Sequence, residues 1–367
     1  MDARLPFDLI RTHEQVSRSP ERRIKASVQR MSGYVPGEQP TSADIIKLNT
    51  NENPYPPAPG VAEVCRGFDL DGLRKYPDPV SAPLCDQLAD LYDCQAENVI
   101  VGNGSDEILA LCTRAFVEDD QKIGFFDPSY SLYPILSEIR DVPVVATPLG
   151  DAFEWREPVA DGCGLFMLAN PNAPSGLGIE SARIRSFCET FEGVVIVDEA
   201  YAEFADDHCL ALALELPNVL VVRTLSKSYA LAGIRLGYAL GHPALISALM
   251  KIKDSYNVNA LTQAMASAAL ADQGYLVETL SRVKATRARL QKALQAMEFD
   301  VMPSQTNFLF VRPKHRRADA LFAALRERNI LVRHFTDERV CDYLRITVGT
   351  DDEIDALLRA LKDIQSS

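Results

Sequence analysis

The sequence predicts an α/β fold in which a large domain, with a mostly parallel sheet flanked by helices, is joined to a smaller α+β domain. Short apolar runs alternate with helical patterns from about residue 97 to about residue 253, which is typical of a parallel sheet between helices. Most runs are rich in Val, Ile and Leu without alternation, so both faces of the sheet should be buried. We expect an N-terminal arm at 1–45 that contributes to the small domain, a large domain at 46–258 and a small domain at 259–367.

The expected elements follow one another along the chain, each strand being bounded by Gly, Pro, Asn or Asp. The strands of the large domain are expected at 98–102, 122–126, 142–147, 164–168, 194–197 and 219–223. Its helices are expected at 106–116, 133–139, 182–191 and 243–252, and a longer helix at 273–297 leads out of it. In the small domain we expect strands at 307–311 and 343–348 and helices at 318–328 and 352–361.

Composition excludes several classes of protein. With 367 residues and 47% hydrophobic content the chain can bury a large core, and no apolar run approaches the roughly 18 residues of a membrane span. The first 30 residues are polar, so we expect neither secretion nor membrane insertion. A formal charge of −13 argues against a nucleic-acid partner, although a few local donors could still hold a small anionic substrate.

The cysteines indicate the cellular compartment, and the spacing of metal-ligating residues indicates whether a metal site is expected. The eight cysteines are scattered without a Cys-x-x-Cys pair, which favours a reducing cytoplasm. The segment 206–209 contains Asp, His and Cys, but it lacks the paired or helical spacing of a metal site and is expected to be a solvated loop. No metal is therefore expected.

The most informative residue is Lys227, which follows the apolar run at 219–223. Asp198 closes another apolar run, and Tyr201 lies three residues beyond it. Open α/β sheets bind ligands at the carboxyl ends of their strands, where this lysine, carboxylate and phenol would meet. A Schiff-base lysine, an acid for a pyridine nitrogen and a donor for a ring oxygen are what pyridoxal phosphate requires. Taken alone, Asp198 could instead cap a turn and Tyr201 could be core packing.

Other strand ends offer the remaining groups. Gly104, Ser105 and Asp106 lie between a strand and a helix, so their backbone N–H groups and the helix dipole form an anion site, although a simple N-cap gives the same pattern. Arg235, eight residues after Lys227, could supply a fork for phosphate, or it could be one more surface arginine. Two further residues follow strands, and each could equally be loop punctuation. They are Tyr130, which could stack on the pyridine, and Asn172, whose amide could reach the ring oxygen.

These residues give the chain a clear resemblance. It resembles the fold-type I pyridoxal phosphate aminotransferases, and within that group it is similar to the histidinol-phosphate aminotransferase family. The motifs typical of the wider group are NPNAPSG at 170–176, DEAY at 198–201, and Ser226-Lys227 with Arg235. The narrower motifs are GYVPGEQP at 33–40, LNTNENP at 48–54, RKYP at 74–77 and LRITVGT at 344–350.

The resemblance implies roles for individual residues. Lys227 would carry the cofactor and move the substrate proton, Asp198 would pair with the pyridine nitrogen, and Tyr201 would bind the ring oxygen, with Ser226 among the cofactor contacts. Arg345 would clamp the substrate carboxylate, although an arginine in a strand could also pair with a neighbouring helix. Tyr76 would reach the cofactor phosphate of a partner subunit, which implies a homodimer.

Three further residues are expected to bind the substrate: Tyr34 of the arm, Asn51 and Arg333, the last of which could equally be a solvated strand end. One departure from the family pattern concerns Ala173, where the family commonly has a second asparagine before the proline. We therefore assign the ring-oxygen contact to Asn172.

The implied reaction interconverts histidinol phosphate and 2-oxoglutarate with imidazole-acetol phosphate and glutamate by a ping-pong mechanism through Lys227. An aromatic amino acid aminotransferase or a threonine-phosphate decarboxylase of the same fold would share the lysine, aspartate and phosphate groups. A non-catalytic regulator that binds the cofactor would need a fused DNA-binding region, for which the arm at 1–45 is too short and too rich in proline.

Overall fold

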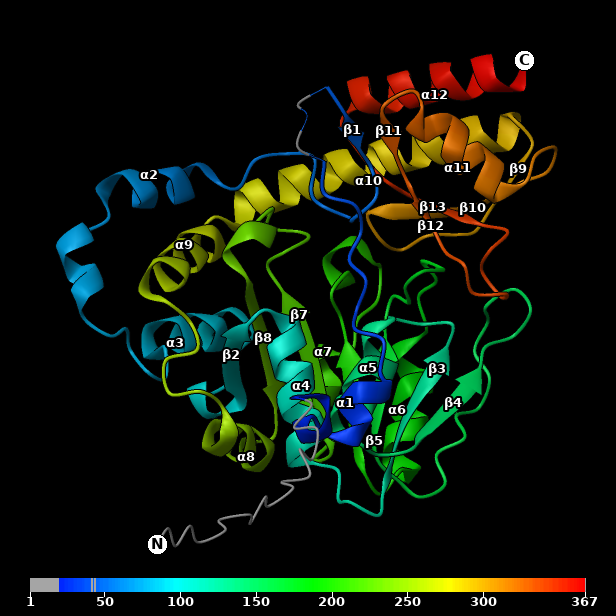
Figure 1. Ribbon diagram of the computed structural model, residues 1–367. Coiled ribbons are helices and arrows are strands. Elements are labelled where there is room, and N and C mark those ends of the chain that lie inside the picture. The colour runs from blue at the N-terminus through cyan, green and yellow to red at the C-terminus, as the bar shows by residue number, and fades with distance from the viewer. Residues whose placement is uncertain (1–19, 41, 43, 367) are drawn as a thin grey trace, which may run out of the picture.

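Two bodies of β-structure lie one above the other, and a long helix runs beside the upper one (Figure 1). The computed structural model describes residues 20–40, 42 and 44–366. The lower body contains a seven-stranded sheet, the upper body contains a four-stranded sheet, and the long helix is α10 (Gln273–Ala296). This is the α/β architecture that the alternation of apolar runs and helical patterns predicts.

The seven-stranded sheet has the order β2-β8-β7-β6-β5-β3-β4. Strand β8 pairs antiparallel with both β2 and β7, and the other four neighbouring pairs are parallel, so the expectation of a mostly parallel sheet is confirmed. The six strands expected from the sequence lie within one or two residues of their predicted ends, whereas β8 was missed. The strands are β2 (Val99–Asn103), β3 (Lys122–Asp127), β4 (Val144–Pro148), β5 (Cys163–Ala169), β6 (Val194–Asp198), β7 (Val219–Thr224) and β8 (Leu236–Gly241).

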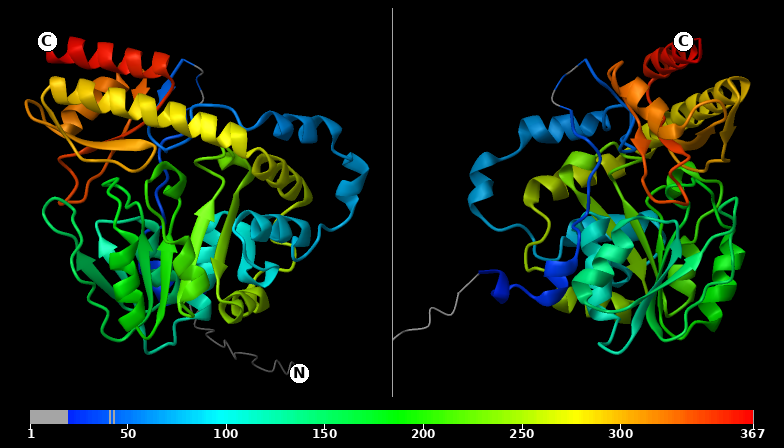
Figure 2. Two further views of the ribbon diagram at one scale, coloured as in Figure 1. Left: turned by 180° about the vertical axis from the view of Figure 1, so that it is seen from behind. Right: turned by 45° about the vertical axis from the view of Figure 1, so that its right-hand side comes forward.

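Helices cover both faces of this sheet (Figure 2). Successive residues of one strand enter different cores, since Val195 and Val197 of β6 belong to one cluster while Ile196 belongs to the other. One face is covered by α4 (Ser105–Ala115), α5 (Leu132–Arg140) and α8 (Pro243–Ile252). The other face is covered by α3 (Ala82–Leu91), α6 (Ser181–Thr190), α7 (Leu210–Glu215) and α9 (Ala260–Ala271), with α2 (Pro59–Gly67) against α9.

The upper body is a four-stranded antiparallel sheet with helices packed on it, in the order β12-β13-β10-β9. Beside it, β1 (Ile46–Lys47) pairs in parallel with β11 (Ile330–Leu331). A capping box of Thr350 and Glu353 starts the last helix. The remaining elements are β9 (Phe299–Val301), β10 (Phe308–Pro313), α11 (Ala318–Arg326), β12 (Arg333–His334), β13 (Leu344–Thr347) and α12 (Asp351–Gln365).

Helix α10 begins in the core of the large sheet and ends in the core of the small sheet. The two domains therefore meet within α10, and not at the expected boundary after residue 258. Helix α9 and Leu276 at the start of α10 belong to the core of the large sheet. Leu290 and Leu294, near the other end of α10, belong to the core of the small sheet. The sequence boundary was placed too early because α9, which we did not predict, buries Ala266 and Ala269 against the large domain.

The arm crosses from one body to the other. Its short helix α1 (Ala26–Arg30) lies against α5, and Lys25 forms an ion pair with Asp141 at 3.2 Å. Further along, Glu38 forms an ion pair with Arg326 of α11 at 2.5 Å, so the arm also holds the small sheet. Residues 1–19 of the expected arm lie outside the described residues. In the described part of the chain, no helix combines the length and apolar character that a membrane span needs.

Candidate active site

A cavity of about 180 Å³ opens where β2, β3, β5, β6 and β7 end, beneath the small sheet and the arm. Its walls contain nearly all of the residues singled out in the sequence, from the ends of β2, β3, β6 and β7, from the arm and from the small domain. The predicted residues that line it are Tyr34, Asn51, Ser105, Asp106, Tyr130, Asp198, Tyr201, Ser226, Lys227, Arg235, Arg333 and Arg345. Three predicted residues do not line the cavity: Asn172, Tyr76 and Gly104, the last of which lies beside Arg235.

Lys227 follows β7, and its side chain reaches the segment between β1 and α2. Its Nζ donates a hydrogen bond to the carbonyl oxygen of Thr50 at 3.2 Å. Burial, together with the positive charge of Arg345, lowers the pKa of Lys227 to about 8. A larger fraction of uncharged amine is therefore present near neutral pH than on a surface lysine, as a nucleophilic lysine requires.

Asp198, the last residue of β6, lies at the floor of the cavity. The Tyr133 hydroxyl donates to its Oδ2 at 2.9 Å, and the backbone N–H of Ala200 donates to its Oδ1 at 3.2 Å. Burial raises the pKa of Asp198 to about 6, although both hydrogen bonds oppose the rise. The carboxylate is thus mostly ionised at neutral pH and can pair with a cation in the cavity. Sequence reasoning missed Tyr133, which lies three residues beyond Tyr130 in the first turn of α5.

The N-terminus of α4 and Arg235 form the expected anion corner. Arg235 Nη2 lies 3.2 Å from Asp106 Oδ2, its Nη1 donates to Ser226 Oγ at 3.3 Å, and the Tyr130 hydroxyl donates to Asp106 Oδ1 at 3.2 Å. Gly104 has a φ of +83°, and a Cβ there would come within 2.6 Å of Arg235 Nη2. Glycine is therefore required for the arginine to lie over the helix N-terminus, where backbone N–H groups attract an anion.

We predicted that the Asn172 amide contacts the ring oxygen of the cofactor, but Asn172 does not line the cavity. Its amide nitrogen donates to the Pro128 carbonyl at 3.2 Å and to Ser175 Oγ at 3.0 Å, and its amide oxygen accepts from Ser129 Oγ at 2.9 Å. All of its side-chain hydrogen-bonding groups are thus occupied by the surrounding loops. Ala173, which has no polar side chain, lines the cavity in its place.

Asn51 lines the cavity, but its side chain faces protein groups and not an open substrate position. Its Nδ2 donates to the Tyr201 hydroxyl at 2.8 Å, and its Oδ1 accepts from the Thr347 hydroxyl at 3.1 Å. Only 1% of Asn51 is exposed. The geometry therefore does not support the predicted direct contact of Asn51 with substrate.

Two arginines from the small sheet face the cavity beneath the arm. Arg345 Nη2 donates to the Asn49 carbonyl at 3.3 Å, while its buried Nε has no hydrogen-bond partner among the described residues. The Arg345 guanidinium lies 5.2 Å from the centre of the Phe308 ring, and Arg333 donates to the Val35 carbonyl of the arm at 3.4 Å. Arg345 thus retains an unused donor in a desolvated setting, which suits an anionic ligand.

Of the two predicted aromatic residues Tyr34 and Tyr76, the first lies at the cavity and the second lies on the surface. The ring of Tyr34 packs edge-on against Tyr130, with ring centres 6.3 Å apart, so the arm closes over the aromatic wall of the cavity. Tyr76 lies away from the cavity of its own chain and is 80% exposed. Its ring stacks on Tyr256, with centres 4.3 Å apart and planes 14° from parallel.

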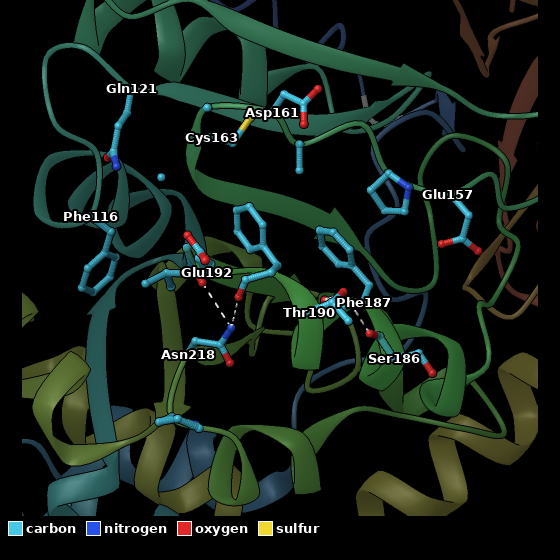
Figure 3. A pocket seen from close by; sticks show the side chains of 18 of the residues that line it. Phe116, Gln121, Glu157, Asp161, Cys163, Ser186, Phe187, Thr190, Glu192 and Asn218 are labelled. Carbon is cyan, nitrogen blue, oxygen red and sulfur yellow. Dashed lines mark hydrogen bonds between the residues drawn. The ribbon is translucent and has the colours of Figure 1, made fainter.

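A second and larger pocket, of about 1540 Å³, opens at the amino ends of β5 and β6 (Figure 3). Its walls carry the carboxylates of Glu157, Asp161 and Glu192, and its described lining residues include no lysine. The Asn218 amide there ties neighbouring backbone together by donating to the carbonyls of Cys188, Phe191 and Gly193. Among its described lining residues this pocket therefore has no lysine amine comparable to that of Lys227.

The residues around Lys227 fit pyridoxal phosphate. One cavity combines an amine of lowered pKa, a buried carboxylate, an aromatic wall and an anion corner whose close approach only glycine permits. These define a fold-type I pyridoxal phosphate-dependent enzyme. The sequence also matches the family described as "Aminotransferase class I and II" over residues 43–361, and the chain belongs to that family.

Curated relatives narrow the family further. The chain is 46% identical to a histidinol-phosphate aminotransferase of Chromohalobacter salexigens, covering 92% of this chain and 97% of the relative. It is 44% identical to a histidinol-phosphate aminotransferase of Synechocystis sp., covering 94% and 99%. The chain therefore belongs to the histidinol-phosphate aminotransferase family.

Solved structures agree with this fold. The histidinol-phosphate aminotransferase of Sinorhizobium meliloti, solved in complex with pyridoxal 5′-phosphate, superimposes with a TM-score of 0.85 at 27% identity, covering 94% of this chain and 98% of that chain. An aspartate aminotransferase of Thermus thermophilus superimposes with a TM-score of 0.80 at 17% identity, covering 94% and 99%, which shows a shared fold.

Proposed function

We propose that the protein is a pyridoxal phosphate-dependent aminotransferase that interconverts histidinol phosphate and 2-oxoglutarate with imidazole-acetol phosphate and glutamate. The observation that carries this proposal is the presence of Lys227 and Asp198 in one cavity, one with a lowered and one with a raised pKa. Relatives named for this activity, at 44–46% identity over most of both chains, support the choice of substrate.

Each side chain of the cavity has its own role toward the cofactor. Bound pyridoxal phosphate would supply an electron sink for the carbanion chemistry of transamination. Lys227 holds the cofactor and moves the proton of the substrate Cα, and Asp198 keeps the pyridine nitrogen protonated by pairing with it. Ser105, Ser226 and Arg235 hold the cofactor phosphate at the helix N-terminus, while Tyr130 packs on the ring.

Arg345 and Arg333 bind the anionic groups of the substrates. A planar guanidinium matches the oxygens of both carboxylate and phosphate, so the same pair of arginines can accept glutamate in one half-reaction and histidinol phosphate in the other. Arg345 clamps the carboxylate, for which its unused Nε is available. Tyr34 closes the arm over the bound substrate.

The active unit is a homodimer in which Tyr76 reaches the cofactor phosphate of the partner subunit. Support comes from its surface position, because Tyr76, Leu70 and Leu73 are 80%, 73% and 55% exposed and form an apolar region that a partner would cover. Sedimentation that gave a monomer at assay concentrations would refute the dimer. We place the enzyme in the cytoplasm, since its eight cysteines are all free thiols.

A substrate panel tests the proposed reaction. Purified protein loaded with pyridoxal phosphate is assayed with 2-oxoglutarate and, in turn, histidinol phosphate, phenylalanine and threonine phosphate as amino donors. We expect the highest kcat/KM with histidinol phosphate. A preference for phenylalanine, or release of carbon dioxide from threonine phosphate, would instead support the aromatic aminotransferase or the decarboxylase.

A further inference from the structure

Asn51 uses every hydrogen-bonding group that it has. It adopts a left-handed conformation with a φ of 58°, and its backbone N–H donates to Thr347 Oγ1 at 3.0 Å. Its carbonyl oxygen accepts from Asn307 Nδ2 at 2.9 Å, and its Oδ1 accepts from the Thr347 hydroxyl at 3.1 Å. Asparagine tolerates this backbone region better than most residues, so both its conformation and its side chain are fixed.

The hydrogen bonds of Asn51 connect the small sheet to the large sheet. Thr347 ends β13 and Asn307 immediately precedes β10, so the small sheet holds three groups of Asn51. The fourth group, Nδ2, donates to the Tyr201 hydroxyl at 2.8 Å. Asn51 thus joins the small sheet to the phenol beside Asp198 on the large sheet.

The direction of this hydrogen bond determines what the phenol can do. Because the Tyr201 oxygen accepts from the amide of Asn51, its own hydrogen is free to be donated to a second acceptor. Among the described residues, this hydroxyl forms a hydrogen bond with Asn51 alone. Ala173, which packs in the same cluster as Tyr201, offers no polar side chain to share the task.

The strand that holds Asn51 also carries the substrate arginine. Arg345 and Thr347 lie two residues apart on β13, so their side chains project from the same face of the strand. Hydrogen bonds thus link β13 to Asn51 through Thr347, and Asn51 to the phenol of Tyr201.

We propose that Asn51 is a positioning residue that holds the Tyr201 hydroxyl as a donor to the cofactor ring oxygen and connects it to the strand bearing Arg345. This inference rests on the proposed function, because it assumes that pyridoxal phosphate binds on Lys227. Its action is indirect, since Asn51 touches the phenol and Tyr201 touches the cofactor.

The test is a pH titration of the absorbance of the bound cofactor, which needs no turnover. A hydrogen bond to the ring oxygen favours the more anionic form of the bound cofactor, so loss of the bond should raise the pH midpoint of the absorbance change. We expect Asn51→Asp to raise the midpoint by about one unit, because a carboxylate accepts the phenol hydrogen and withdraws it from the ring. Tyr201→Phe should produce a similar rise.

Two further variants separate positioning from general damage. Asn51→Gly permits the left-handed backbone without the amide, so it should raise the midpoint while keeping the backbone relaxed. Thr347→Val removes only the contact from β13 and should give a smaller rise. Combining Asn51→Asp with Tyr201→Phe should add little to either single change, since both act through one hydroxyl.

The outcomes distinguish this inference from the proposed function. If the wild-type protein binds no cofactor on Lys227, the proposed function fails. If it does, and Tyr201→Phe moves the midpoint while Asn51→Asp and Asn51→Gly leave it unchanged, the positioning role of Asn51 is overturned. A Thr347→Val variant with the wild-type midpoint would overturn the connection to β13.

Discussion

The Tyr133 hydroxyl donates a hydrogen bond of 2.9 Å to Oδ2 of Asp198 from within the core beneath the cavity. Both side chains are buried, so the phenol replaces solvent as a donor to the carboxylate. A buried carboxylate without such a donor would be protonated more readily. The ionisation of Asp198, and with it the proposed pairing to a cationic ring nitrogen, therefore depends on a residue that lies outside the cavity wall.

Tyr133→Phe should weaken cofactor binding at the acidic end of the pH range. Loss of the donor raises the pKa of Asp198 above its present value of about 6, by about one unit or less. The variant then loses the ionised carboxylate at a higher pH than wild type. On acidification, its affinity for pyridoxal phosphate should therefore begin to fall at a higher pH. The measurement is a fluorescence titration of the cofactor-free protein with pyridoxal phosphate at several pH values. These values run from about pH 5.5 to about pH 8, roughly the range that the shift spans.

Tyr238→Phe provides the matched control, because Tyr238 is also a fully buried tyrosine but bonds to the Tyr92 hydroxyl. It should leave the pH profile of binding unchanged. Identical profiles for wild type and Tyr133→Phe would contradict the proposed dependence.

Asp198→Asn should stabilise the cofactor-free protein at neutral pH. The pKa of Asp198 is about 6 in the fold and 3.8 when unperturbed, so the folded state binds more protons between these values. The free energy of unfolding then falls as pH rises through this window and stays lowered above it, by about 3 kcal/mol. Asparagine removes this penalty while retaining the hydrogen bond from Tyr133.

Thermal unfolding of the cofactor-free proteins measures the effect. The Tm of Asp198→Asn should exceed that of wild type at pH 7.5, and the difference should shrink toward pH 4, about where the free carboxyl titrates. A variant that is equally or less stable at both pH values would show that burial does not strain this carboxylate.

Gly104→Ala should damage the anion corner. The φ of +83° disfavours alanine, and the new Cβ would come within 2.6 Å of Arg235 Nη2, so the guanidinium must move away from the helix N-terminus. We expect the Kd for pyridoxal phosphate to rise about tenfold or more, which corresponds to the loss of one charge-assisted hydrogen bond. Equilibrium dialysis of the cofactor gives the value.

Gly233→Ala is the control, because Gly233 lies two residues before Arg235 and a Cβ there meets nothing within 4 Å. Its Kd should match that of wild type. Equal loss in both variants would mean that general loop damage, and not the close approach at Gly104, weakens binding.

Arg345→Lys should impair the reaction while keeping the charge. A lysine cannot offer two parallel donors, so the kcat/KM for glutamate should fall about tenfold or more. The control is Arg312→Lys, which changes an exposed arginine near the end of β10 that pairs with Asp300. Steady-state kinetics with glutamate for both variants separates an effect on the site from an effect on the sheet. An Arg345→Lys variant with wild-type kcat/KM would remove Arg345 from substrate binding.

Much of the site follows from the sequence because parallel strands bring their carboxyl ends to one edge. Asp198, Lys227 and Ser105 each follow an apolar run, so their meeting could be predicted from the alternation of strands and helices. Strand β8 was missed because Gly237 and Gly241 weaken its strand signal. Both are required by packing, since a Cβ would come within 2.3 Å of the Ser105 nitrogen and 2.4 Å of a Leu220 methyl group.

Contacts between distant segments could not be predicted in this way. Asn51 and Thr347 are separated by 296 residues, and Tyr133 and Asp198 by 65, so no local pattern links them. The orientation of an amide is equally hidden. Asn172 directly precedes a residue that lines the cavity, yet Ser129, Pro128 and Ser175 hold its side chain elsewhere.

The central claim is that Lys227 carries the cofactor, and reduction by borohydride tests it most directly. Protein incubated with pyridoxal phosphate is reduced and digested, and the modified lysine is located by mass spectrometry. We expect one pyridoxyl group per chain on Lys227, no label in Lys227→Ala, and normal labelling in Lys251→Ala, which alters an exposed lysine of α8. Stoichiometric label on another lysine, or undiminished label in Lys227→Ala, would contradict the assignment.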